Sequence, residues 1–490
     1  MRKQEIFTTG IKNTLILNNQ MKNAENISYV SFLSIVAALG GLLFGYDTAV
    51  ISGTVSQVTT QFELSTMQSG WYVGCALVGS IAGVLCAGAL SDKFGRKKTM
   101  IISALLFSIS GIGCAIAANF DQLVIVRIIG GAGIGIVSIV CPLYISEISP
   151  ASYRGRMVSL YQLAVTFGFL AAYLMNYYLL KLSADFSSSN PMLQKIFATE
   201  AWRGMLGMEA LPAVLFLFVI ALIPESPRWL IVRNKESAAV AVLSKIYEDK
   251  ELISFQISET KLMLQNQGKS DIKMLVQPGI FKAVLIGCAI AMLGQFMGVN
   301  AVLYYGPSIF ESSGLSSGDS LFYQSLIGVV NMATTILALF IIDKVGRKKL
   351  VYVGVTGMIL TLILIGVYFL YGQTWGLSGV FLLICFLAYI FFCAGSISAV
   401  IFVFLSEMYP TKIRGLAMSV AGFSLWVGTY LVGQLTPWML ETLSPSGTFF
   451  LFAAMCIPYM LIVWKLMPET AGKSLEDIER FWLKKKDDRN

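Results

Sequence analysis

The chain has 490 residues, of which 56% are hydrophobic and only 13% charged, and its mean hydropathy is +0.72. Average soluble domains carry about 25% charged residues, so this composition excludes an ordinary soluble protein. The net charge is +8, but the basic clusters alternate with long apolar stretches, which argues against nucleic acid as a partner.

The apolar stretches have the length of membrane-spanning helices. A helix needs about 20 apolar residues to cross a hydrocarbon core of roughly 30 Å. Closed barrels are the other structure that satisfies its backbone in lipid, but barrel strands would be shorter and alternating. The sequence therefore predicts an all-α membrane protein with twelve transmembrane helices, at 30–52, 69–90, 99–118, 121–143, 157–180, 203–223, 281–304, 321–342, 350–371, 380–405, 415–440 and 447–467.

Lys and Arg are concentrated in the segments that join spans 2–3, 4–5, 6–7, 8–9 and 10–11. The positive-inside rule then predicts a multi-pass protein of the cell membrane with both termini cytoplasmic. We divide the chain into a cytoplasmic N-terminal tail, a first six-helix half, a cytoplasmic linker with short helices, a second six-helix half and a cytoplasmic C-terminal tail, at 1–29, 30–223, 224–280, 281–467 and 468–490.

Internal repetition supports the two halves. Three motifs occur twice, in the same order and at similar offsets: the basic loops 92–98 and 343–349, the Ser-Glu and Arg-Gly pairs within 146–155 and 406–415, and the Pro-Glu-Ser/Thr triplets 224–226 and 468–470. Parallel repeats of this kind are related by an axis along the membrane normal and bind substrate between the halves, near mid-depth.

The repeated loops place a glycine, Gly95 or Gly346, beside a cationic cluster, where it allows a tight turn. We expect their Asp residues to cap neighbouring helices, and Glu147 and Glu407 to pair with Arg154 and Arg414. Together the charged residues would hold the two halves in one state and separate in the other; anchoring to anionic headgroups is the alternative. The candidate gate residues are Asp92, Arg96, Glu147, Arg154, Glu225, Arg228, Asp343, Arg347, Glu407, Arg414 and Glu469.

Three ionisable residues, Asp47, Arg127 and Glu209, lie inside otherwise apolar spans. A charge at bilayer depth costs at least about 3 kcal/mol on insertion scales, so it is rarely kept without a function. An acid and a base in different spans indicate a proton-handling pair, and hence a transporter rather than a passive pore. A static structural ion pair is the alternative. Because the chain has no His, the proton carrier must be a carboxylate.

We expect no cofactor, no metal site and no enzymatic activity. The eight cysteines lie in or beside apolar spans and form no CxxC pair, which is typical of small packing residues. The sequence also lacks a clustered nucleophile and base, a metal-ligand set and a phosphate-cradling loop.

Five motifs carry a family resemblance: GYDTAVISG at 45–53, RIIGG at 127–131, PESPRWL at 224–230, QFMGVN at 295–300 and PET at 468–470. They resemble the sugar porter family of the major facilitator superfamily, and most closely its bacterial proton-coupled members of the xylose–proton symporter type. The resemblance implies a proton–monosaccharide symporter that works by alternating access, with Asp47 as proton acceptor, Arg127 as its partner and Glu209 as a supporting carboxylate. An uncoupled sugar facilitator is the alternative, and a sugar sensor is a less favoured one.

Sugar hydroxyls need both donors and acceptors, which amide side chains offer without charge. By resemblance, the candidate sugar-binding residues are Phe44, Gln162, Gln295, Asn300, Tyr304, Asn331, Phe402 and Trp426. Helix–helix hydrogen bonding is the alternative role for the amides, and core or lipid packing is the alternative for the aromatic residues.

The sequence departs from the family pattern at three places. Gly294 precedes Gln295 where a second Gln is usual, residues 398–402 replace a Gly-Pro and a pocket Trp in span 10, and Leu425 replaces a Gln before Trp426. Loss of Gly-Pro would alter the bend of span 10. Losing hydrogen-bond partners changes which hydroxyls a pocket prefers, so the sugar is left open between pentose and hexose. The expected partners are a sugar, a proton and the bilayer, with a monomer as the functional unit.

Overall fold

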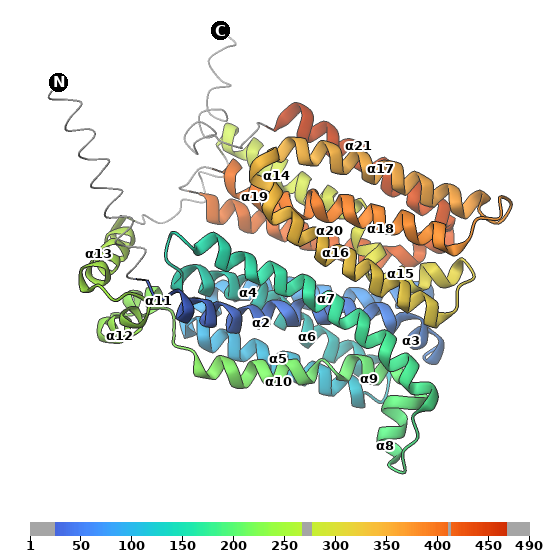
Figure 1. The fold of residues 1–490 in the computed structure, drawn as a ribbon, viewed down its shortest axis with the longest axis horizontal. Coiled ribbons are helices and arrows are strands. Elements are labelled where there is room, and N and C mark those ends of the chain that lie inside the picture. The colour runs from blue at the N-terminus through green and yellow to red at the C-terminus, as the bar shows by residue number, and fades with distance from the viewer. Residues whose placement is uncertain (1–24, 267–276, 410–412, 468–490) are drawn as a thin grey trace, which may run out of the picture.

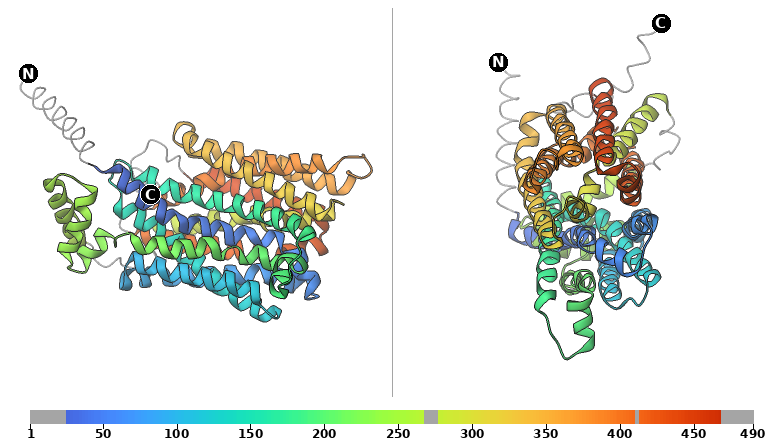
Figure 2. Two further views of the ribbon diagram at one scale, coloured as in Figure 1. Left: turned by 60° about the horizontal axis from the view of Figure 1, so that its bottom comes forward. Right: turned by 90° about the vertical axis from the view of Figure 1, so that its right-hand side faces the viewer.

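The computed structural model describes residues 25–266, 277–409 and 413–467, without the side chains of a few further residues that include Asp343 and Phe402. In these residues twelve helices are long and apolar enough to cross a membrane. Each of the twelve predicted spans corresponds to one of them. The helices form two bundles that lie side by side with their axes roughly parallel (Figures 1 and 2).

The first half contains spans 1–6. Span 1 is α2 (Ile27–Val50), continued by the short helix η1 (Ile51–Gly53), and α3 (Val55–Gln61) follows it. Spans 2–5 are α4 (Thr66–Phe94), α5 (Arg96–Ile116), α6 (Phe120–Ile148) and α7 (Arg154–Asp185). The short helices α8 (Pro191–Gln194) and η2 (Lys195–Thr199) lead to span 6, which consists of α9 (Ala201–Gly207) and α10 (Ala210–Leu222).

The linker and the second half follow. The linker carries α11 (Pro227–Val232), α12 (Glu236–Ile246) and α13 (Lys250–Asn266). Span 7 is α14 (Pro278–Phe296) with α15 (Val299–Ser312), and spans 8 and 9 are α16 (Ser317–Val345) and α17 (Arg347–Tyr371). Span 10 is α18 (Gly379–Gly395) with α19 (Ile397–Met408), and spans 11 and 12 are α20 (Arg414–Thr442) and α21 (Ser444–Leu466).

Three spans are interrupted, and two of the interruptions have a clear local cause. In span 6, Pro212 has no N–H to donate to the carbonyl of Met208, so the helix breaks at Met208 and Glu209. In span 7, Gly298 takes the left-handed conformation with φ of 91°. Span 10 breaks at Ser396, so the helix is interrupted there although the Gly-Pro pair is missing.

Glycines let the helices of the first half approach closely. A β-carbon on Gly45 of α2 would overlap the carbonyl oxygen of Val165 on α7 and would lie 3.0 Å from the backbone nitrogen of Phe169. On α4 and α6, Gly79 and Gly131 each face the backbone of the other helix in the same way. This backbone-to-backbone contact makes the first half a tightly packed body.

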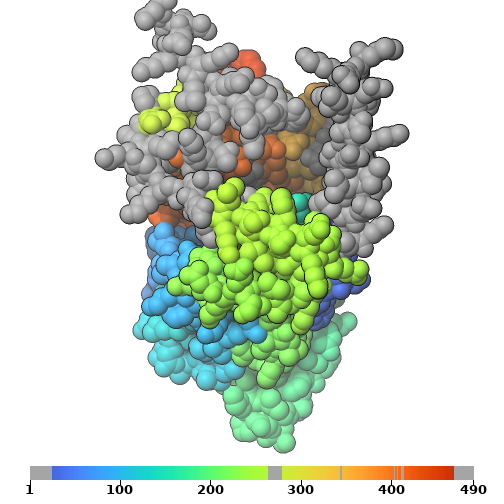
Figure 3. Space-filling view, turned by 90° about the vertical axis from the view of Figure 1, so that its left-hand side faces the viewer, coloured from blue at the N-terminus to red at the C-terminus, as the bar shows by residue number. Residues whose placement is uncertain are grey.

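The linker marks one end of the bundle, which we call the linker end; the opposite end is the far end. Figure 3 shows α11–α13, in lime green, over the linker end of the first half. Trp229 of α11 donates from Nε1 to the carbonyl of Asp92 at 2.9 Å, and Asn26, before α2, donates to the carbonyl of Ile246 at 2.8 Å. The linker is thus hydrogen-bonded to the first half.

The close contact at Gly45 predicts a stability difference. Gly45→Ala should lower the free energy of unfolding by about 1–3 kcal/mol, because the added methyl group meets rigid backbone rather than a flexible side chain. Gly88→Ala is the matched control, since its β-carbon would have no neighbour within 4 Å. Thermal unfolding of the two purified variants in detergent measures the difference. Equal melting temperatures would contradict the packing described for α2 and α7.

Candidate functional site

Asp47 and Arg127 meet inside the first half. Asp47 lies on α2 and Arg127 on α6, and Nη1 of Arg127 donates to Oδ1 of Asp47. Asp47 is 0% exposed and Arg127 is 2% exposed. The second carboxylate oxygen of Asp47 and Nε of Arg127 have no hydrogen-bond partner among the described residues. The predicted acid and base therefore form one buried, incompletely satisfied ion pair that is shielded from lipid.

Glu209 completes a group of three charges. It is 1% exposed and sits at the break of span 6, where the interrupted helix brings it near both Asp47 and Arg127. Its Oε1 also lacks a partner within the described structure. Two acids thus face one base, and the three come from three different spans.

A small cavity connects Arg127 to the second half. Its wall includes Arg127 and, from span 7, Tyr304. The remaining lining residues come from α2, η1, α4 and α6: Thr48, Ile51, Val73, Ala76, Leu77 and Ile134. The cavity brings the charged group to the boundary between the halves, where the sequence predicts the substrate.

The interruption of span 7 gathers polar groups at that boundary. Asn300 donates from Nδ2 to Oε1 of Gln295 at 2.7 Å, and Thr429 of α20 donates from Oγ1 to the same oxygen at 3.1 Å. Tyr389 of α18 donates to the carbonyl of Met297 at 2.8 Å, which satisfies one backbone group freed by the break. Gln295 and Asn300 are both half-buried, so part of each amide is accessible.

The other candidate sugar residues are less closely grouped. Phe44 of the first half and Trp426 of the second have ring centroids 6.0 Å apart. Gln162 on α7 is exposed and Asn331 on α16 is half-buried, and the hydrogen bonds of the Gln295 side chain to described residues go to Asn300 and Thr429 instead. The side chain of Phe402 lies outside the described part of the structure.

At the linker end of the first half, Glu147 has a different partner from the one expected. Arg96 donates to it from Nε and Nη2, both at 2.9 Å, whereas the exposed Arg154 donates from Nε to the carbonyl of Ser146. The carboxylate that caps the start of α5 also differs from the one expected. Glu225, not Asp92, accepts from the backbone of Arg96 and Lys97 at the start of α5, at 2.8 Å and 3.1 Å.

The second half repeats part of this arrangement. Arg347 donates from Nη2 to Oε1 of Glu407 at 3.1 Å, and Gly95 and Gly346 both take positive φ, 96° and 90°, as the repeated loops predict. Arg414 donates from Nε to the carbonyl of Tyr409, and Arg228 is exposed. Glu469 and the side chain of Asp343 lie outside the described residues. Every ion pair between described side chains lies within one half or within the linker, and the latch across the halves stays a prediction.

Hydrogen bonds between the halves lie toward the far end. Three are formed by described residues: Gln434 to the carbonyl of Met67 at 3.0 Å, Tyr173 to the carbonyl of Leu303 at 3.0 Å, and Thr66 to Glu441. Gly70 and Gly74 of α4 leave the space that Gln434 occupies. The halves are therefore held together at the far end.

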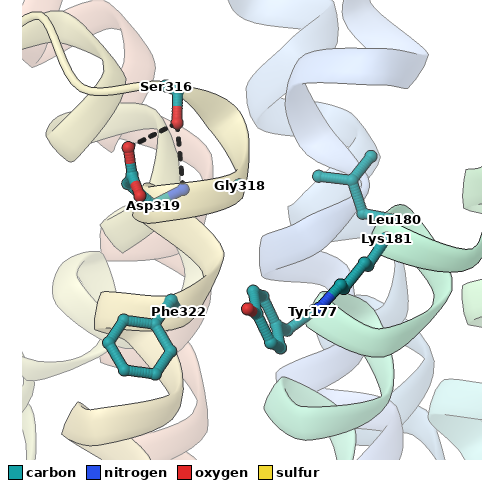
Figure 4. A pocket seen from close by; sticks show the side chains of 7 residues that line it. All are labelled: Tyr177, Leu180, Lys181, Ser316, Gly318, Asp319 and Phe322. Carbon is teal, nitrogen blue, oxygen red and sulfur yellow. Dashed lines mark hydrogen bonds between the residues drawn. The ribbon is translucent and has the colours of Figure 1, made fainter. Parts of the chain in front are cut away.

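Beside these contacts, a crevice of about 400 Å³ separates the ends of α7 and α16 (Figure 4). Lys181 lies on one side and Asp319 on the other, and Asp319 is hydrogen-bonded to Ser316 at 2.6 Å. The crevice contains none of the predicted site residues. Its lining residues are Tyr177, Leu180, Lys181, Ser316, Gly318, Asp319 and Phe322.

Two further buried polar residues of the first half were not predicted. Asn176 is 0% exposed and donates from Nδ2 to the carbonyl of Val50 at 3.0 Å, where α2 ends above Asp47. Arg203 is 2% exposed and donates to the carbonyl of Ala117 at 2.6 Å and to Glu200 at 2.5 Å. Burial alone would raise the pKa of Glu200, but hydrogen bonds from Gln61 and Arg203 lower that pKa below its usual value. The sequence signals are an Asn next to Tyr177 and Tyr178 and the Glu-x-x-Arg spacing of Glu200 and Arg203.

Comparison with known proteins points to the same family as the sequence motifs. The family model described as "Sugar (and other) transporter" matches residues 33–482. The chain is 36% identical to the arabinose-proton symporter of Bacillus subtilis (strain 168) over 467 residues, which cover 95% of this chain and 98% of that protein. It is also 36% identical to the D-xylose-proton symporter of Escherichia coli (strain K12), with 94% and 97% covered. The inward-open structure of the xylose transporter XylE from E. coli is similar with a TM-score of 0.80 at 35% identity, covering 93% of this chain and all of that one.

The buried contact of Arg96 predicts a large effect of its removal. Arg96→Ala should lower the free energy of unfolding by about 3–5 kcal/mol, because Glu147, whose side chain is 3% exposed, would remain buried without a charged partner and keep only the hydrogen bond from Oγ of Ser226. Lys98→Ala removes the same charge from an exposed position of α5 and should change stability by less than about 0.5 kcal/mol. Denaturant unfolding in detergent measures both variants. A similar loss in each would show that net charge, not the ion pair, determines the effect.

Proposed function

This chain belongs to the sugar transporter family of the major facilitator superfamily, and we propose that it couples the entry of protons to the uptake of a monosaccharide. The family consists of transporters, and the chain is a multi-pass membrane transporter. The relatives named above carry arabinose or D-xylose together with a proton. These names support a monosaccharide as the substrate of this chain.

The buried Asp47–Arg127 pair carries the proposal of proton coupling. Arginine stays protonated in proteins, so the carboxyl group of Asp47 is the member of the pair that can change its charge. When a proton neutralises Asp47, the guanidinium loses its counter-charge and must find another partner. The cavity beside Arg127 reaches Tyr304 of the second half, so this rearrangement would be transmitted to the boundary where substrate binds.

Glu209 is the partner that Arg127 would meet next. It is buried in the same group, and one of its oxygens has no hydrogen-bond partner in the described structure. Transfer of the guanidinium from Asp47 to Glu209 would keep one negative charge opposite one positive charge in both states. This exchange would lower the free-energy cost of protonating Asp47.

The sugar would bind between the halves at the interrupted span 7. Gln295, Asn300 and Thr429 already form a hydrogen-bonded group there, and their bonds could be exchanged for bonds to sugar hydroxyls. Phe44 and Trp426 would cover the apolar face of the ring from both halves. We assign Gln162, Tyr304, Asn331 and Phe402 to the same pocket on the family resemblance.

Alternating access explains where the halves touch. We place the linker end and both termini in the cytoplasm, as the distribution of Lys and Arg predicts. The hydrogen bonds across the halves then close the extracellular side, and the conformation is inward-facing, which agrees with the similarity to an inward-open transporter. The ion pairs at the linker end would keep each half rigid while the halves rotate.

An uncoupled facilitator is the second candidate function. It would use the same pocket, and its transport would need no titratable pair. Asp47, paired with Arg127 and removed from water, favours coupling because it supplies a titratable carboxyl group that uncoupled transport does not require. Sugar added to proteoliposomes discriminates between the two functions, since only a symporter makes the external medium more alkaline as sugar enters.

Replacement of the proton carrier should separate accumulation from exchange. Asp47→Asn keeps the shape of the side chain but cannot take up a proton, so accumulation of labelled D-xylose or arabinose driven by a pH gradient should fall to the level of empty vesicles. Exchange of labelled for unlabelled sugar across the same membrane should persist. Both rates are measured in proteoliposomes that contain equal amounts of folded protein.

Asp121→Asn is the matched control, because it makes the same chemical change at an exposed position in the first turn of α6. This variant should accumulate sugar like the unaltered protein. If Asp47→Asn still concentrated sugar against a gradient, the role given to Asp47 would be wrong. A panel of pentoses, hexoses and polyols competing with one labelled sugar would then identify the substrate class.

A further inference from the structure

A hydroxyl group faces the free side of the Asp47 carboxylate. A β-carbon built on Gly130 of α6 would overlap Oγ of Ser110 on α5, and the same β-carbon would lie 3.1 Å from Oδ2 of Asp47. The missing side chain of Gly130 therefore leaves a niche that Ser110 and Asp47 both border. A larger residue at position 130 would fill this niche and separate the two oxygens.

Both oxygens are buried, and the thiol of Cys114, a weak hydrogen-bonding group one turn along α5, lies beside Oγ of Ser110. Ser110 is 0% exposed, and neither its Oγ nor Oδ2 of Asp47 has a hydrogen-bond partner in the part of the chain that the structure describes. Buried hydroxyl groups in proteins nearly always have a partner. Arg127 engages only the other carboxylate oxygen, Oδ1. In this conformation the Ser110 hydroxyl is therefore not hydrogen-bonded to the Asp47 carboxylate.

Protonation of Asp47 changes which hydrogen-bond partners its carboxyl group requires. A neutral carboxylic acid carries an O–H that must donate, and leaving a buried donor unpaired is unfavourable. Arg127 cannot accept a hydrogen bond, because a guanidinium group offers donors only. The Ser110 hydroxyl is an acceptor on the side of the carboxyl group that carries no bond to Arg127.

We propose that Ser110 is a positioning residue for proton coupling, which accepts a hydrogen bond from Asp47 when that side chain is protonated. The inference rests on the proposed function. The proton arrives from water and forms an O–H bond at Oδ2, while Ser110 keeps its own proton and only accepts. The hydroxyl thereby stabilises the protonated carboxyl group and releases Arg127 from Oδ1. Gly130 provides the space in which the two oxygens approach each other.

Other ionisable groups near Asp47 do not provide this contact. Arg127 faces it from α6, Glu209 from span 6, Cys114 from α5 and Cys75 from α4, and Tyr72 of α4 lies near Arg127. In the protonated state of Asp47 proposed above, Glu209 is the partner of Arg127, and the two thiols are weak acceptors. The hydroxyl of Tyr72 is hydrogen-bonded to Thr54 at 2.8 Å. Ser110 is therefore the neutral oxygen acceptor that borders the niche.

The test is the dependence of sugar uptake on external pH. Ser110→Ala removes the acceptor and keeps the small size of the side chain, so half-maximal uptake should require about tenfold more protons, a shift of about one pH unit toward acid. Uptake should recover at saturating proton concentration, because the carboxyl group itself is retained. Initial rates of labelled D-xylose or arabinose uptake in proteoliposomes give the midpoint.

Ser108→Ala is the matched control. Ser108 is also a buried serine of α5, but its hydroxyl donates to the carbonyl of Ala104 at 2.8 Å within the same helix. This variant should keep the midpoint of the unaltered protein. Ser110→Thr restores a hydroxyl group and should return the midpoint toward that value if it folds.

Three outcomes overturn the inference. An unshifted midpoint in Ser110→Ala would show that the hydroxyl does not contact the protonated acid. A shift toward alkaline pH would show that Ser110 donates to the charged form instead. An equal shift in Ser108→Ala would show a general effect on α5. If the unaltered protein transports sugar without moving protons, the proposed function itself fails, and this result is distinct from the other three.

Discussion

The fold is arranged around one electrostatic constraint, the burial of Asp47 opposite Arg127. A single charge at this depth is strongly unfavourable, so each residue requires the other to stay nearby while it is ionised. The constraint fixes α2 against α6 and brings the interrupted span 6 close enough for Glu209 to join them. It also makes the charge state of one carboxyl group a determinant of how the first half is packed.

Helix interruptions place polar groups where straight helices could not. In an unbroken span, the backbone N–H and C=O groups are used in hydrogen bonds within the helix itself. Only the side chains are then free to bind groups on other helices. The break at Gly298 frees the carbonyl of Met297, which Tyr389 satisfies, and sets Gln295 and Asn300 against each other. The break of span 6 before Pro212 brings Glu209 close to Asp47 and Arg127. The two polar centres of the molecule thus both depend on residues that weaken a helix locally.

Much of the fold follows from the sequence, because length and apolar character are sufficient to define spans in lipid. Family membership and the all-helical architecture were predicted correctly, and so was the glycine turn at positions 95 and 346. Which charged side chains pair with one another was not predictable in the same way. Glu147 was matched to Arg154, which is near in sequence, whereas the folded chain brings Arg96 to it across α5 and α6. Asn176 and Ser110 were missed because a lone small polar residue in an apolar span has no periodic or compositional signal.

The attachment of the linker has a mechanical consequence. Glu225, Trp229 and Ile246 tie it to the first half by bonds to α5, to the end of α4 and to the start of α2. The molecule then moves as two rigid bodies rather than three, since the linker moves together with the first half. A fluorophore on the exposed face of α13 would accordingly report the tilt of that body, and its distance from a second dye on α17 would trace the transport cycle.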